Sequence, residues 1–118
     1  MANGRVVFVP SNADCVGSFD PNTDVFICID ISSHITVNNK FRDAATANDG
    51  RAIFAPYNAN CVGTFNPTTN VVSCIDISSQ ISSNSKFIGT AKTNDGRVIF
   101  APYNADCVGV FDPTTNGF

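Results

Sequence analysis

Gly50-Arg51-Ala52-Ile53-Phe54 is the stretch that decides the fold, because the chain contains it three times. It occurs first as Gly4-Arg5-Val6-Val7-Phe8 and last as Gly96-Arg97-Val98-Ile99-Phe100. The spacing is 46 residues each time (50 − 4 and 96 − 50). A constant period of this length is typical of repeat proteins, in which each unit is one supersecondary structure that packs on its neighbours. Residues 1–118 therefore form a single repeat region of about two and a half units.

The composition favours strands and disfavours two classes of partner. Val, Ile, Thr and Phe are frequent, whereas Leu and Glu are absent, which favours strands over helices. The formal net charge is −3, and the Lys and Arg residues are scattered along the chain. We expect no nucleic-acid partner, since such a partner requires basic residues gathered on one face. We also expect no membrane partner, because no segment approaches the ~18 apolar residues of a membrane span.

The central unit divides into four segments of strand length that are separated by turn signals. Asn48-Asp49-Gly50 is one such signal, and the stretch from Asn66 to Asn70 is another. In the second turn, Pro67 presets φ and the closing Asn70 tolerates the left-handed conformation. The predicted strands are residues 41–47, 51–55, 61–65 and 71–77, followed by a polar connector over residues 78–86.

This arrangement predicts a β-propeller. Four short strands per unit, tight turns and a longer connector at this period describe a propeller blade. We therefore predict an all-β fold of antiparallel four-stranded blades, which form an incomplete ring within one chain. A solenoid of strands is the alternative, although its units are usually shorter.

Residues 96–116 carry a resemblance to a known family. Their sequence is Gly-Arg-Val-Ile-Phe-Ala-Pro-Tyr-Asn-Ala-Asp-Cys-Val-Gly-Val-Phe-Asp-Pro-Thr-Thr-Asn. It resembles the blade repeats of the YVTN and NHL-like β-propellers, which contain a strand, an Asn-containing turn, a second strand and an Asp-Pro-x-Thr-Gly/Asn turn. The resemblance extends repeat by repeat over the whole chain and implies a propeller. It selects no activity, since such propellers serve as lyases, hydrolases, ligand binders and scaffolds. The repeated cysteines and the short length depart from the family pattern.

The blade boundaries predict an incomplete ring. Residues 4–31 form a first blade that lacks its inner strand, residues 41–77 form a complete central blade, and residues 87–118 form a last blade that stops before its outer strand. A closed ring usually takes ~4 to 8 blades. Either several chains share one propeller, or this chain is an excerpt of a longer array. Because the copies agree at more than half of their positions, blade–blade contacts should be interchangeable between chains, which favours a homo-oligomer.

The five cysteines follow the same period, and two interpretations of them stay open. Cys15 and Cys28 lie on the two arms of a predicted hairpin, as do Cys61 and Cys74, while Cys107 has no partner in its unit. If Phe19 faces Asp24, Cys15 and Cys28 lie directly opposite and can form a disulfide; if Asp20 faces Val25, they lie diagonally and a disulfide is strained. Alternatively, all five are small buried hydrophobic residues. The absence of CxxC spacing disfavours a metal site, whereas paired cysteines would favour an extracellular location.

Four residues in the repeated Pro-Tyr-Asn-Ala turn are candidate binding residues: Tyr57, Asn58, Tyr103 and Asn104. Loops at one end of a propeller often carry binding residues, and an aromatic ring beside an amide suits a carbohydrate. The pattern favours a structural alternative, in which the Asn side chain hydrogen-bonds the backbone of its own turn and the Tyr packs on the neighbouring blade. For Arg5, Arg51 and Arg97 it favours solvated strand ends over binding of an anionic group.

For the repeated aspartates and for His34, the sequence favours structural roles over functional ones. Asp30 and Asp76 repeat within apolar strands, where an outward position on an edge strand is favoured over binding of cations or sugars. His34 has no counterpart, because Gln80 occupies the equivalent position, and a solvated loop residue is favoured.

The sequence predicts a non-enzymatic, self-assembling propeller module with a structural or binding role. We expect no catalytic residue, no cofactor and no metal. A multivalent carbohydrate-binding propeller is one alternative. A fragment of a larger propeller protein or enzyme is another, for which His34, Arg42 and Asp43 are the candidates that differ between copies.

Overall fold

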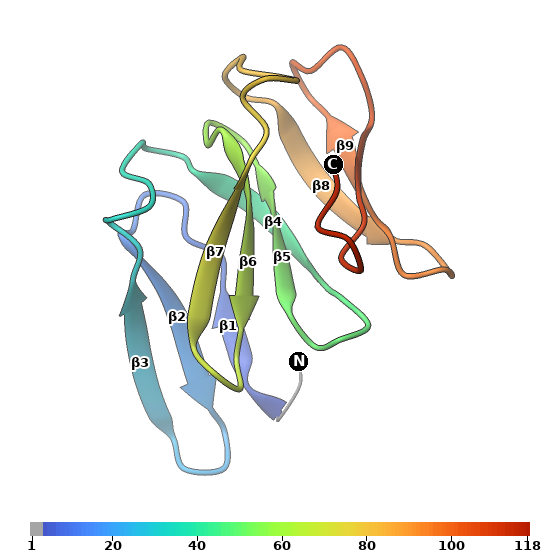
Figure 1. Cartoon of the computed structure of the whole chain (residues 1–118). Helices are drawn as coiled ribbons and strands as arrows, with labels where there is room; N and C mark the ends of the chain where they lie inside the picture. Colours follow the sequence, from blue (N-terminus) through green and yellow to red (C-terminus); the bar gives the residue numbers. More distant parts are fainter. Residues whose placement is uncertain (1–3) are drawn as a thin grey trace.

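The computed structural model describes residues 4–118, which form three antiparallel sheets arranged one after another (Figure 1). Each sheet is a meander in which strands adjacent in sequence pair with each other. The prediction of an all-β fold is confirmed. Sheet 1 contains β1 (Val6–Phe8), β2 (Cys15–Asp20) and β3 (Val25–Asp30); sheet 2 contains β4 (Phe41–Thr46), β5 (Ala52–Pro56), β6 (Cys61–Asn66) and β7 (Val71–Asp76); sheet 3 contains β8 (Phe87–Lys92), β9 (Val98–Pro102) and β10 (Gly109–Phe111).

The same five-residue turn occurs in all three sheets, at Asp20–Asp24, Asn66–Asn70 and Asp112–Asn116, and its first and last residues are always Asp or Asn. In the Asp20–Asp24 turn of sheet 1, the backbone N–H of Asp24 donates to the carbonyl of Asp20 (2.8 Å), and the N–H of Asn22 donates to the Asp20 carboxylate (2.9 Å). The final residue has a positive φ of 58°. Asp and Asn tolerate that conformation better than other residues with side chains, and as first residues they bond the backbone two positions on.

The sheets are held together because each one buries a face against its neighbour. The strands alternate their side chains, so every sheet has two faces. Two clusters of buried apolar side chains result. Between sheets 1 and 2 the cluster includes Val16, Ile31, Phe41, Ala52, Phe54 and Phe65; between sheets 2 and 3 it includes Ile53, Val62, Ile77, Phe87, Val98, Phe100 and Phe111.

The first strands of sheets 2 and 3 also meet through polar contacts. The backbone N–H and the hydroxyl of Thr90 on β8 both donate to the carboxylate of Asp43 on β4 (3.1 and 3.2 Å). The Thr90 hydroxyl also lies 3.1 Å from the carbonyl of Ala44. Asp43 therefore positions the neighbouring strand, a role that does not depend on any reaction.

A repeated glycine on β2, β6 and β10 lets aromatic rings pack closely over its strand. Gly63 lies opposite Phe54 on β5 and Cys74 on β7. A Cβ atom on Gly63 would lie 2.9 Å from both Cζ of Phe41 and Cδ2 of Phe54, closer than real Cβ atoms approach. Gly17 and Gly109 are crowded by rings in the same way. The glycine therefore makes room for the phenylalanines that fill the space between sheets.

We predict that Gly63→Ala lowers the free energy of unfolding by about 1–3 kcal/mol, because the added methyl group overpacks a filled core. Gly89→Ala is the matched control, since its new Cβ would meet its nearest neighbour, Cβ of Ala101, at an ordinary 3.5 Å. We expect the control to keep or slightly raise stability. Denaturant unfolding of both variants measures the difference, and equal losses would contradict the packing explanation.

Candidate functional site

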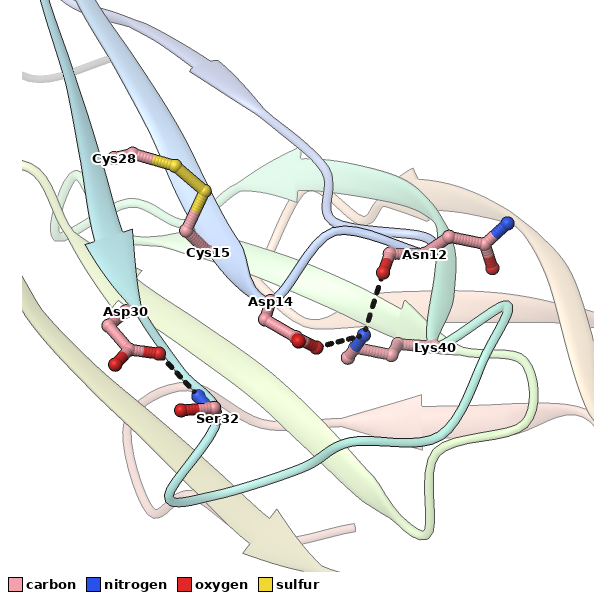
Figure 2. The surroundings of a disulfide bond; sticks show 7 residues. All are labelled: Asn12, Asp14, Cys15, Cys28, Asp30, Ser32 and Lys40. Atoms are coloured by element: carbon pink, nitrogen blue, oxygen red, sulfur yellow. Dashed lines mark hydrogen bonds and ion pairs between the residues drawn. A yellow bond between two sulfur atoms is a disulfide. The ribbon is translucent and has the colours of Figure 1, made fainter.

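Two disulfides each link an outer strand, β3 or β7, to the strand beside it. The structure pairs Asp20 with Val25, so Cys15 and Cys28 lie diagonally rather than opposite each other. They nevertheless form a disulfide with a Cα–Cα distance of 5.4 Å (Figure 2). Cys61 and Cys74 form the equivalent disulfide at 5.3 Å. Both distances are usual for disulfides. The disulfide therefore forms in the diagonal register. The alternative in which all five cysteines are buried thiols is wrong, because four are paired and Cys107 is exposed.

Cys107 is an exposed free thiol. It is the counterpart of Cys15 and Cys61 in the third repeat. Among residues 4–118, no group of three or more His, Cys, Asp or Glu side chains is placed to hold a metal ion.

Lys40 anchors the connector between sheets 1 and 2, a role that the sequence analysis did not identify. Its side chain is fully buried, and its Nζ lies 3.2 Å from Oδ1 of Asp14 and 3.4 Å from the carbonyl of Asn12 (Figure 2). The side chain of Asn12 accepts the backbone N–H of Asn39 (2.7 Å). The signal was present in the sequence, since Lys40 and Lys86 are one period apart.

Lys86 repeats this anchor without the carboxylate. Asn60 takes the place of Asp14, and Nζ of the buried Lys86 is 3.5 Å from the carbonyl of Asn58. Within residues 4–118 the structure gives Lys86 no ion pair. Burial lowers the pKa of Lys86 from the ordinary value of 10.5, because desolvation disfavours the charged amine.

The two candidate tyrosines lie beside each other. The ring centroids of Tyr57 and Tyr103 are 6.2 Å apart, and the guanidinium of Arg42 lies 4.3 Å from the centroid of Tyr57. Tyr103 is exposed. The turns after β5 and β9 thus place two aromatic rings and one cation on the same part of the surface.

The two candidate asparagines lie in equivalent turns. The side chain of Asn58 donates to the carbonyl of Asn38 (3.1 Å) and accepts the backbone N–H of Ser85 (2.9 Å). These contacts hold a connector on each side. Asn104 is exposed, and its backbone N–H donates to the carbonyl of Ser85 (2.9 Å). Asn58 is therefore engaged in the structure of the repeat, whereas the Asn104 side chain faces solvent.

His34 and Asp76 border an open cleft of about 560 Å³ beside the first connector. Asp76 is exposed and accepts the backbone N–H of Ser78 (2.8 Å), and the pKa of Asp76 is lowered by that bond and by the Ser78 hydroxyl. Asp30 and Ser32 repeat the arrangement in the first repeat (Figure 2). These aspartates organise the turns that follow their strands.

Arg51 joins the second repeat to the third. Its Nη1 donates to Oδ1 of Asn116 (3.1 Å), and its Nη2 donates to the carbonyl of Pro113 (2.6 Å). An ion pair between its Nε and Asp49 (2.9 Å) holds the guanidinium in place. The prediction that the repeated arginines lie at solvated strand ends is wrong for Arg51, because the following sheet places its Asp112–Asn116 turn over the guanidinium.

Comparison with protein-family models gives no match, and no curated protein matches the sequence. Among solved structures, the extracellular domain of a putative one-component system from B. thetaiotaomicron is similar, with a TM-score of 0.70 and 14% sequence identity. The match covers 99% of this chain and 16% of that chain. At this identity the similarity shows the fold alone. In residues 4–118, no helix is long and apolar enough to cross a membrane.

We predict that Asn60→Asp stabilises the protein by up to about 1 kcal/mol at neutral pH, because it gives Lys86 the ion pair that Lys40 has. In the natural chain, folded Lys86 loses its proton at a lower pH than an unfolded lysine. Stability should therefore rise as the pH approaches 10.5, and the variant should show a smaller rise. Denaturant unfolding at neutral and alkaline pH measures both effects. An unchanged pH dependence would contradict this assignment.

Proposed function

We propose that the protein is a non-enzymatic structural module whose three sheets are blades of a β-propeller and whose copies assemble head to tail. The observation that carries the proposal is the distribution of buried faces among equivalent repeats. Sheet 2 has a sheet on each side, and both of its faces are covered. Sheets 1 and 3 each have only one neighbouring sheet, so one face of each is uncovered. The equivalent faces of the other sheets are buried.

Sheet 1 exposes the face that sheets 2 and 3 bury. Phe8 is 50% exposed and Phe26 is 55% exposed, whereas Phe54, the counterpart of Phe8, is 1% exposed. Phe100, the third copy, is fully buried. The repeats therefore have the same phenylalanine on this face, but only in sheets 2 and 3 does a neighbouring sheet bury it. A neighbouring sheet would complete sheet 1 as it completes the others.

Sheet 3 exposes the opposite face. Val108, the residue just before β10, is 57% exposed, whereas its counterparts Val16 and Val62 are fully buried against the following sheet. Val110 is also exposed, although the equivalent Ser18 and Thr64 are buried. The exposed face of sheet 3 is therefore equivalent to the faces of sheets 1 and 2 that pack against the following sheet.

These two faces fit one another by the rule that holds inside the chain. A second copy can place its sheet 1 on sheet 3 of the first, in the way that sheet 3 lies on sheet 2. Such a contact joins different surfaces, so it forms a ring if the rotation closes and a filament if it does not. Two copies would contribute six sheets, which lies within the usual range of ~4 to 8 blades.

We predict that the protein forms a discrete oligomer and that Phe8→Asp disrupts it, because a carboxylate cannot be buried unpaired at the new interface. Val71→Asp is the matched control. Val71 is 57% exposed in sheet 2, where both faces are already covered, so its exposure does not reflect a missing neighbour. The control should assemble like the natural chain.

Light scattering after gel filtration, with and without reductant, measures the mass of each protein. A natural chain that is monomeric at every concentration would overturn the proposal. Assembly that survives Phe8→Asp would show that another surface is used.

Carbohydrate binding is the second candidate function, and the adjacent rings of Tyr57 and Tyr103 favour it. The exposed ring of Tyr103 beside the half-buried ring of Tyr57 offers a stacking platform for a sugar. We predict that Tyr103→Ala reduces any signal on a glycan array, whereas Asn104→Ala reduces it less because the ring supplies most of the contact area. An absent signal, or one unaffected by Tyr103→Ala, would exclude this function.

A further inference from the structure

We propose that Arg97 of one copy binds the Asp20–Asp24 turn of a second copy, as Arg51 binds the Asp112–Asn116 turn within the chain. This inference rests on the proposed head-to-tail assembly and names the polar contact that directs it. The partner is a second copy of this chain, and the contact is an ion pair between a guanidinium and the turn of the following repeat.

The donor side is prepared in the same way in both repeats. Gly50 and Gly96 precede the two arginines with φ values of 90° and 91°. The Nε of Arg97 pairs with Asp95 at 3.0 Å, just as the Nε of Arg51 pairs with Asp49 at 2.9 Å. The Thr93 hydroxyl and the Arg97 guanidinium lower the pKa of Asp95 to about 2. The carboxylate that orients Arg97 therefore remains charged at neutral pH.

Exposure is where the two arginines differ. The side chain of Arg51 is 17% exposed, whereas that of Arg97 is 47% exposed. The turn of sheet 3 covers Arg51 and accounts for the difference. Arg97 occupies the same place at the uncovered face of sheet 3, where the second copy would dock.

The acceptor side also repeats its geometry. In the first and third turns, the N–H two residues after the leading Asp donates to its carboxylate at 2.9 Å, in Asn22 and Thr114 respectively. The closing residues Asp24 and Asn116 have φ values of 58° and 55°. By repeat equivalence, the Asp24 side chain and the Pro21 carbonyl correspond to the two groups that Arg51 contacts, the Asn116 side chain and the Pro113 carbonyl.

The first and third turns differ at their third and closing residues, and only the closing residue changes the charge. Within the chain, Asn70 and Asn116 close the second and third turns, and Arg51 meets the neutral amide of Asn116. Asp24 offers a carboxylate, which accepts charge-assisted hydrogen bonds from a guanidinium. Arg97 would therefore favour the first turn of another copy over any other turn of the repeat, which fixes both the direction and the register of assembly.

Salt provides the first test. In the natural chain, added salt should weaken self-association, because it screens the attraction between Arg97 and Asp24. In Arg97→Asp, two carboxylates would face each other, and we expect self-association to weaken by roughly tenfold or more at low salt. Added salt should then strengthen association of that variant. Sedimentation across a salt series reports the sign of each dependence.

Mixing provides the second test. Arg97→Asp alone and Asp24→Arg alone should each assemble poorly, since each places like charges at the contact. An equal mixture should recover assembly, because every contact between the two variants joins opposite charges. Asp24→Asn is the matched control: it reproduces the residue of the other turns, so it should assemble while losing most of the salt dependence.

The outcomes separate this inference from the function on which it rests. A monomeric natural chain would overturn the assembly itself. A natural chain that assembles, with Arg97→Asp showing the same affinity and the same salt dependence, would overturn the Arg97–Asp24 contact alone. Because Asp24 has a positive φ, Asp24→Arg can lose stability, and its melting temperature is measured beside the natural chain. If it unfolds, the reversed salt dependence of Arg97→Asp decides the question.

Discussion

The structure depends on one constraint: a small sheet with two apolar faces stays out of water only when a sheet lies on each side. Sheet 2 satisfies this condition, and every residue of β5 is buried. In β1, the equivalent strand of sheet 1, two of three residues are exposed. The strands have similar apolar character, so the difference arises from their neighbours. Stability therefore comes from the stacking of repeats rather than from any single sheet.

Polar groups place the sheets so that this burial can occur. The side chains of Asn12 and Asn58 hold the connectors between repeats by accepting their backbone N–H groups. The buried side chains of Lys40 and Lys86 anchor the same connectors. Each anchor repeats at the same point of the unit. At the opposite end, Arg51 holds the turn of the following sheet. The apolar faces supply the driving force, and these contacts set the position of each sheet.

The disulfides act where burial is weakest. The outer strands β3 and β7 alternate exposed and partly buried residues, so packing alone holds them less firmly than the middle strands. Each disulfide ties such a strand to the buried strand beside it. A covalent link of this kind stabilises mainly by restricting the unfolded chain. It can therefore retain an outer strand that contributes little apolar surface.

The sequence by itself determined the repeat, the all-β class and the strand positions, because turn residues and apolar runs act locally. The predicted strand over residues 61–65 is observed as Cys61–Asn66, for example. The sequence left the cysteines open, since hairpin register and twist depend on how strands pair. Only the tertiary structure showed that Asn58 is engaged by connectors and that Arg51 is covered. It also showed that Lys86 is buried with no carboxylate partner among the described residues, and that the equivalent Phe8 and Phe54 differ in exposure. These properties belong to neighbours in space, and a local pattern cannot specify which surface comes to lie against another.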